Sequence, residues 1–274
     1  MKKMISTLRV NALNVFLMGG LMVIASSCEK NDDEYNNNPP PPPLSTVLKA
    51  SGDSLGIVAT INQFRSILGD SLNTIPGKTS GRREVNWDAV PASFTNNELF
   101  PFDFFNLTDP AGANGRKRGL VFLNTVSALR VDSTNFADID AAHANEFIPF
   151  SKKKTMIASN TNVSEIVFKV AGTAKDAFVN GFGIIFSDVD DAASTSLEFF
   201  NGNKSLGVFK APAKTATGAF SFLGVHFPGE KVTRVKITAG NNALTAGIKD
   251  ISDGGSKDLV VFDDFFYDEP KQNQ

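Results

Sequence analysis

Two groups of aspartates are the residues whose types and spacing most directly suggest chemistry. Asp188, Asp190 and Asp191 follow an apolar segment and precede a loop, and Asp263 and Asp264 form a second acidic pair near the C-terminus. Carboxylate oxygens are the ligands that calcium prefers. If the fold brings both groups to one edge, they form a calcium site with only oxygen ligands. The alternative is that each aspartate makes local turn hydrogen bonds and faces solvent.

Asn86, Trp87 and Asp88 form a second candidate site. Trp87 is the only tryptophan in the chain. An indole ring between an amide and a carboxylate can stack on the face of a pyranose while its neighbours bind the hydroxyl groups, so this triplet predicts a sugar-binding site. The alternative is that the ring fills the core, where a large aromatic side chain buries much apolar surface.

A third set of residues resembles the catalytic elements of GDSL-type esterases. Residues 52–56 read G-D-S-L-G, with Ser54 at the nucleophile position, and Asp140 and His143 have the D-x-x-H spacing of the remaining triad. A serine nucleophile of this kind needs a strand-to-helix turn at the edge of an α/β sheet. The chain has almost no helical pattern from which to build that sheet. The alternative is that Asp53 or Ser54 caps the following helix, and we expect no catalytic residues and no enzyme activity.

The rarity of cysteine and histidine excludes several kinds of site. Cys28 is the only cysteine, and His143 and His226 are the only histidines. With Cys28 assigned to a lipid anchor, the folded domain has no disulfide, no cysteine nucleophile and no thiolate zinc site. Two histidines also exclude a three-histidine metal centre.

The N-terminal 27 residues have the pattern of a cleavable export signal. Lys2, Lys3 and Arg9 precede an apolar run over 15–24, and small residues at 25–27 come directly before Cys28. This arrangement resembles a bacterial lipoprotein signal, with Cys28 as the acylated residue. The alternatives are an ordinary signal peptide and a short membrane anchor, although the run is shorter than the roughly 20 residues that span a bilayer.

Residues 28–43 are expected to form a tether between the lipid and the domain. An acidic, asparagine-rich stretch over 29–38 precedes a proline run over 39–43, and such a composition stays extended. The acidic stretch resembles the export signal of Bacteroidota-type lipoproteins that face the cell exterior from the outer membrane. Without the leader the chain has 24 basic and 29 acidic residues, a net charge of −5. We therefore expect membrane attachment through acyl chains and no nucleic-acid partner.

Residues 44–274 are predicted to fold as a single domain. Apolar residues recur at helical spacing over 54–69, and Gly69 stands where the helix would stop. The Asn201-Gly202 pair between two apolar segments predicts a hairpin. Many short strands separated by turn residues predict an all-β, antiparallel β-sandwich of jelly-roll type with one short N-terminal helix. The expected strands cover 119–123, 129–131, 165–170, 182–186, 197–200, 206–209, 219–227, 232–238 and 259–267.

Several motifs together resemble a family of uncharacterised secreted bacterial proteins. They are G-R-R-E-V-N-W-D-A-V-P over 81–91, F-D-F-F-N over 102–106, R-G-L-V-F over 118–122, G-F-G-I-I-F-S-D-V-D over 181–190, F-L-G-V over 222–225 and D-D-F-F-Y over 263–267. The resemblance covers residues 54–270, and Ala89 replaces a glycine that is usual in the family. The family has no established activity, so the resemblance implies no particular chemistry.

These observations favour a cell-surface lipoprotein whose domain is a non-catalytic binding or adhesion module, with extracellular glycan as the favoured ligand. A structural or assembly component of the cell envelope that binds protein partners is the second expectation. A GDSL-like esterase is the third. Fold analogy with carbohydrate-binding jelly rolls supports the first expectation only weakly, because a fold does not fix a function.

Overall fold

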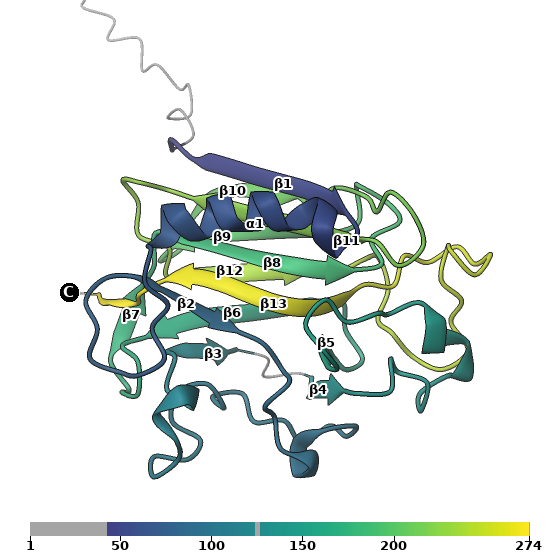
Figure 1. The fold of residues 1–274 in the computed structure, drawn as a ribbon, viewed down its shortest axis with the longest axis horizontal. Helices are drawn as coiled ribbons and strands as arrows, with labels where there is room; N and C mark the ends of the chain where they lie inside the picture. Colours follow the sequence, from purple (N-terminus) through teal and green to yellow (C-terminus); the bar gives the residue numbers. More distant parts are fainter. Residues whose placement is uncertain (1–42, 124–126, 274) are drawn as a thin grey trace, which may run out of the picture. The chain divides into compact units, whose positions relative to one another are not determined.

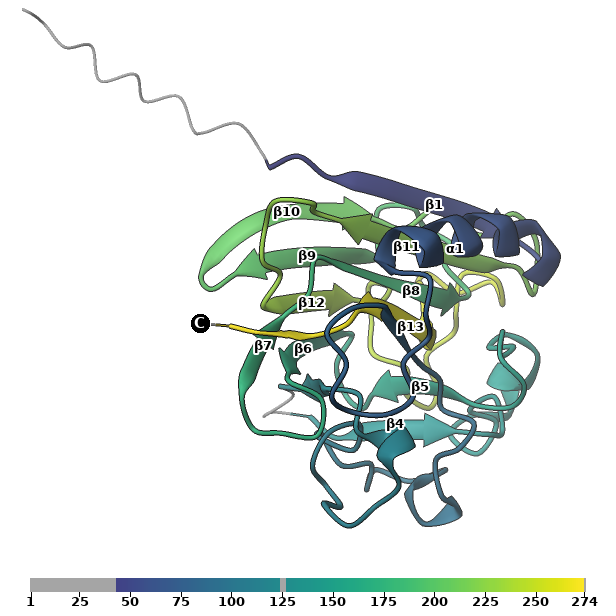
Figure 2. The same cartoon turned by 60° about the vertical axis from the view of Figure 1, so that its left-hand side comes forward.

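Two antiparallel sheets and one α-helix make up the described part of the protein. The computed structural model describes residues 43–123 and 127–273, so the expected signal peptide, Cys28 and almost all of the tether lie outside the described residues. The expected all-β sandwich with one short N-terminal helix is confirmed. Figure 1 shows the arrangement of the strands, and Figure 2 gives a second view of the same layers.

The first sheet has the strand order β1-β11-β8-β13-β5-β4, and β2 pairs with β13 beside this path. Its pairings are antiparallel, for example Phe222 opposite Ile185 and Phe265 opposite Val85. The bounds are β1 Thr46–Gly52, β2 Arg82–Val85, β4 Leu129–Asp132, β5 Thr155–Ala158, β8 Gly181–Ser187, β11 Phe220–His226 and β13 Val261–Asp268.

The second sheet has the order β10-β9-β12-β6-β7-β14, and β3 pairs with β6. These pairings are antiparallel as well. The bounds are β3 Leu120–Phe122, β6 Val163–Lys169, β7 Asp176–Phe178, β9 Ser196–Asn201, β10 Lys204–Lys210, β12 Arg234–Thr238 and β14 Lys271–Gln272. Three short 3-10 turns lie in the connections, η1 Ala92–Phe94, η2 Asn114–Arg116 and η3 Ala141–Asn145.

The main core lies between the two sheets. Period-two alternation directs Phe182 and Phe265 of the first sheet, and Phe168 and Phe199 of the second, into one buried cluster. Phe182 contacts Phe168 across the interface with ring centroids 6.0 Å apart in an edge-to-face arrangement. The abundance of phenylalanine in the sequence therefore corresponds to ring packing between the sheets, as expected.

Helix α1, Ser54–Leu68, packs on the outer face of the first sheet (Figure 1). Asp53 is its N-cap, with Oδ1 accepting a 2.7 Å hydrogen bond from the Gly56 backbone N–H. Gly69 ends the helix, and its N–H donates to the Arg65 carbonyl. Throughout the described ranges, no helix has the length and apolar composition that crossing a membrane requires.

Glycines in β8 and β11 allow this helix to approach the sheet closely. A Cβ atom at Gly183 would lie 2.8 Å from the Phe64 ring, and one at Gly224 would lie 2.9 Å from the same ring. Any larger residue at either position would displace Phe64, which is fully buried. Gly183 and Gly224, each inside a strand motif, thus allow close helix packing.

Most elements lie where the sequence predicts them. All nine expected strands are present, as β3, β4, β6 and β8 to β13, with small differences at their ends. The strands β1, β2, β5, β7 and β14 were not predicted, because they are short or lie half-exposed at an edge without clear alternation. The predicted hairpin joins β9 to β10, but Asn201 pairs with Lys204, so the turn is centred on Gly202 and Asn203.

Candidate functional site

Trp87 belongs to the core, which corrects the expectation of a sugar-stacking ring. Its side chain is fully buried, and its ring packs edge-to-face on Phe265 with centroids 5.3 Å apart. Its Nε1–H donates a 2.9 Å hydrogen bond to the Asp263 carbonyl. A ring enclosed on all sides has no face for a pyranose. Asp88 accepts a hydrogen bond from the Lys153 backbone N–H, and only Asn86 of the predicted triplet is exposed.

The charged residues of the same motif also have structural roles. Arg83 forms a buried ion pair with Glu269, with Nε 2.7 Å from Oε2. Glu84 pairs with Arg65 of α1 and with Arg82, and these two arginines lower the pKa of Glu84 although burial acts to raise it. The motif therefore links α1, β2 and the segment after β13.

Three aspartates converge, but the group differs from the one the sequence predicts. Carboxylate oxygens of Asp188, Asp190 and Asp250 all lie within 4.8 Å of one another. Lys214 forms ion pairs with Asp188 and, at 2.9 Å, with Asp190. An ammonium group thus already supplies positive charge to this cluster. Asp250 was missed because it is distant in sequence, and its only local signal is the D-x-S turn in which its carboxylate accepts from the Ser252 N–H.

The three aspartates of this cluster have pKa values that are shifted in different directions. Burial raises the pKa of Asp188 to about 7, although Lys214 acts to lower it. Burial and a hydrogen bond with Asp250 raise the pKa of Asp190. Burial acts to raise the pKa of Asp250 too, but hydrogen bonds from Asp190, the Leu259 N–H and Ser252 outweigh it and lower that pKa. The pKa values of this pair are thus shifted in opposite directions, upward for Asp190 and downward for Asp250.

The other predicted calcium ligands lie elsewhere. Asp263 and Asp264 sit at an irregularity in β13, where the register shifts between Phe262 and Phe265. Asp263 accepts from the Phe150 N–H at 2.6 Å, and Ser151 Oγ donates to both carboxylates. Burial, followed by the Asp264 charge, raises the pKa of Asp263. Asp191 is exposed and accepts from the Ala193 N–H. The structure therefore does not bring these three residues into the cluster.

The esterase-like residues do not assemble into a triad. Asp140 caps η3, accepting from the Ala142 N–H at 3.0 Å, and also accepts from the Gly247 N–H. His143 is buried, and its Nδ1 lies 3.3 Å from Glu146. Ser54 is exposed in the first turn of α1. The His143 backbone N–H donates to the Asp140 carbonyl within η3. Among the described residues, no side-chain hydrogen bond joins Ser54 to His143 or the His143 ring to the Asp140 carboxylate, which supports the capping alternative.

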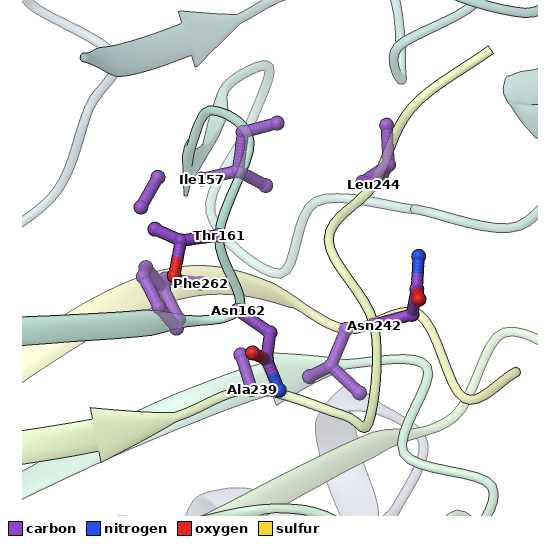
Figure 3. A pocket seen from close by; sticks show the side chains of 9 residues that line it. Ile157, Thr161, Asn162, Ala239, Asn242, Leu244 and Phe262 are labelled. Atoms are coloured by element: carbon purple, nitrogen blue, oxygen red, sulfur yellow. The ribbon is translucent and has the colours of Figure 1, made fainter. Parts of the chain in front are cut away.

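Two cavities of the domain differ widely in volume. The cavity in Figure 3 lies among Ile157, Asn162, Leu244 and Phe262. Its volume is about 10 Å³, enough for one water molecule. A larger pocket of about 300 Å³, here called the arginine pocket, reaches the lower end of the range typical of ligand sites. It is lined by Asn86, Ala89, Val90, Phe104, Phe105, Ala113, Gly115, Arg116 and Arg118.

The arginine pocket combines an apolar wall with cationic donors. Val90, Phe104 and Phe105 are nearly fully buried and form the wall. The Arg116 guanidinium lies over Phe104, 4.7 Å from the ring centroid, and its nearest carboxylate, on Asp109, is 3.9 Å away. Among the residues that the structure describes, no acidic side chain lines the pocket. The sequence predicts Asn86 as a binding residue but assigns neither arginine to a site, although Arg118 begins the R-G-L-V-F motif. Arg116 and Arg118 lie 30 and 32 residues beyond Asn86 in the chain.

Arg118 is the half-buried charge of this pocket. Its Nε donates a 2.7 Å hydrogen bond to the Gly115 carbonyl, and Nη1 donates to the Glu84 carbonyl. Within residues 43–123 and 127–273, no carboxylate forms an ion pair with Arg118. Burial is the largest cause that lowers the pKa of Arg118, since desolvation disfavours its charged form. The charge of Glu84 acts to raise this pKa but does not offset the burial. Arg118 is thus a partly desolvated cation that forms no close ion pair with a described carboxylate.

Comparison with models of protein families, with curated proteins and with solved structures finds no match to this chain. Fold and site geometry are therefore the grounds for assigning a function.

Proposed function

We propose that the protein is a cell-surface lipoprotein whose β-sandwich domain is a non-catalytic binding module, with extracellular glycan as its ligand. The arginine pocket is the binding site in this proposal. The observation that carries it is the lining, which joins an apolar wall to the polar groups of Asn86, Arg116 and Arg118. Ligand pockets commonly have this composition, with a few polar groups that orient the ligand.

The same lining favours binding over catalysis. In the described part of the chain, no serine, threonine, cysteine, histidine, aspartate or glutamate lines this pocket. Such a pocket offers hydrogen-bond donors but no side chain that acts as a general base or nucleophile near neutral pH. This supports the non-enzyme assignment at this site.

A glycan array with the full-length protein in detergent tests the binding function. Phe104 is too deeply buried for a harmless substitution, so the test variant is Ala113→Trp, at an exposed position that lines the pocket. The matched control is Ala192→Trp, which is also exposed and lies outside the lining. We expect selective glycan binding that Ala113→Trp abolishes and Ala192→Trp retains. Equal binding by both variants would place the binding site elsewhere.

Membrane attachment is tested separately with Cys28→Ala, since Cys28 lies outside the described residues. In the proposal, acyl chains on Cys28 hold the protein in the outer membrane and the domain faces the cell exterior. We expect the variant to move from the membrane fraction to the soluble fraction with unchanged thermal unfolding. Retention of the variant in membranes after an alkaline wash would reject lipid anchoring at this residue.

A further inference from the structure

We infer that the arginine pocket selects an anionic ligand, and that the ligand is a sugar bearing a carboxylate, a uronic acid. The sugar part of this inference rests on the proposed function above. The anionic part rests on the charges of the pocket alone.

Arg118 is half-buried and keeps part of its hydrogen-bonding capacity free for a ligand. Two of its nitrogens donate to backbone carbonyls, which fixes the direction of the guanidinium. The remaining nitrogen, Nη2, donates no hydrogen bond to any described residue. The Glu84 charge compensates the burial of this guanidinium only in part. A half-buried guanidinium that has lost part of its hydration without a close ion pair is electrostatically unfavourable. An anion entering the pocket would supply the missing partner.

Arg116 is a second cation at the same pocket. Both residues line the same pocket, and Arg116 is held over the Phe104 ring. Its contact with Asp109 is weak, because the 3.9 Å separation is long and the Asp109 side chain is 48% exposed. Both guanidinium groups line one pocket, so a ligand carboxylate that enters it meets two cationic donors. Guanidinium groups suit a carboxylate because their planar donors match its two oxygens.

The apolar wall of the pocket indicates what the rest of the ligand is. The wall formed by Val90, Phe104 and Phe105 is apolar, so the carboxylate must be attached to a body with an apolar face. A pyranose ring has such a face, and the exposed Asn86 amide lies at the pocket to bind a hydroxyl group. A pocket of about 300 Å³ accommodates one sugar residue of a chain. An inorganic anion would leave the apolar wall without a contact.

Binding to uronic-acid oligosaccharides and their methyl esters tests this inference directly. The ester removes the charge while the sugar chain stays the same. We expect the full-length protein to bind at least one acid form, and its ester more weakly by about 10-fold or more, because hydrogen bonds to a charged group are stronger than those to a neutral one. Added salt should weaken binding of the acid form and leave the ester unaffected.

Two matched variants localise the effect. Ala89→Glu places a carboxylate at an exposed position in the lining, where it would pair with the arginines and repel the ligand. Ala192→Glu makes the same change at an exposed position outside the lining. We expect Ala89→Glu to abolish binding of the acid form and Ala192→Glu to retain it. Arg118→Lys, which keeps the charge but loses the planar fork, should weaken binding without preventing folding.

The outcomes separate this inference from the proposed function. If acid and ester forms bind equally, or if only neutral glycans bind at the pocket, the anionic assignment is overturned and the binding module stands. If Ala89→Glu and Ala192→Glu bind the acid form equally well, the arginine pocket is not the site of recognition. If neither neutral nor acidic glycans bind, the proposed function and this inference both fail.

Discussion

Arg83 and Glu269 form a bidentate ion pair in the interior of the protein. Arg83 Nε lies 2.7 Å from Glu269 Oε2 and Nη2 lies 2.8 Å from Oε1, and neither side chain is more than 2% exposed. Asn73 also donates to Glu269 Oε2 at 2.8 Å. The pair joins β2 to the segment after β13, which are far apart in sequence.

Removing one member of this pair should strongly destabilise the fold. Glu269→Gln leaves the Arg83 charge buried, and we expect the free energy of unfolding to fall by about 3–5 kcal/mol in urea denaturation. The double variant Arg83→Met/Glu269→Leu should lose less, because it removes both charges. Glu230→Gln is the control, since it breaks an exposed pair with Lys204 and should change stability little. A Glu269→Gln variant as stable as wild type would show that this pair is not structurally important.

The position of Trp87 predicts the fluorescence of the protein. As the only tryptophan and a fully buried one, it should emit at short wavelength and resist acrylamide quenching until the protein unfolds. Trp87→Phe removes the donor to the Asp263 carbonyl, and we expect a loss of about 1–3 kcal/mol, measured by circular dichroism. If acrylamide quenched Trp87 in the native protein and a sugar ligand protected it, the stacking interpretation would be restored.

Neighbouring residues at the start of α1 should differ in their effect on stability. Asp53→Ala removes the N-cap and should lower the free energy of unfolding by about 0.5–2 kcal/mol. Ser54→Ala should leave stability almost unchanged, because the Asp53 side chain makes the cap contact. An ester-substrate screen on both variants provides the control. Loss of a reproducible esterase activity in Ser54→Ala alone would reinstate the nucleophile assignment.

The sequence predicted the fold better than the site, for physical reasons that particular residues illustrate. The alternation of apolar and polar residues and the presence of turn residues involve only neighbours in the sequence. Strands such as β8 and the hairpin at Gly202 could therefore be predicted. Trp87 was ambiguous, because a core ring and a stacking ring have the same local pattern. Asp250 and Arg118 were missed, because tertiary contacts bring them to Asp188 and Asn86.

Lys214 and calcium should compete for the cluster of Asp188, Asp190 and Asp250. Lys214→Met removes the resident cation, and we expect a lower melting temperature that calcium raises by several degrees. Calcium at a hundredfold excess over its Kd would contribute about 2.7 kcal/mol. The wild-type protein should respond less, and Lys210→Met, at an exposed lysine outside the cluster, should resemble wild type. Identical melting curves of Lys214→Met in calcium and in EGTA would reject a calcium site here.

Asp188 should make stability depend on pH. Its pKa is about 7 in the folded protein against an ordinary value of 3.8, so the folded state binds the proton more tightly than the unfolded state. The resulting stabilisation is complete below about pH 4 and is lost as the pH rises to about 7. Its upper limit is about 4 kcal/mol, because each pKa unit corresponds to about 1.4 kcal/mol.

Asp188→Asn removes this titration, so its stability relative to wild type should rise between pH 5 and pH 8 in urea denaturation with EGTA present. Asp191→Asn is the matched control, because Asp191 is exposed and lies outside the cluster. Its pH dependence should follow wild type. A constant difference between Asp188→Asn and wild type over this range would mean that Asp188 stays ionised, with Lys214 compensating fully for its burial.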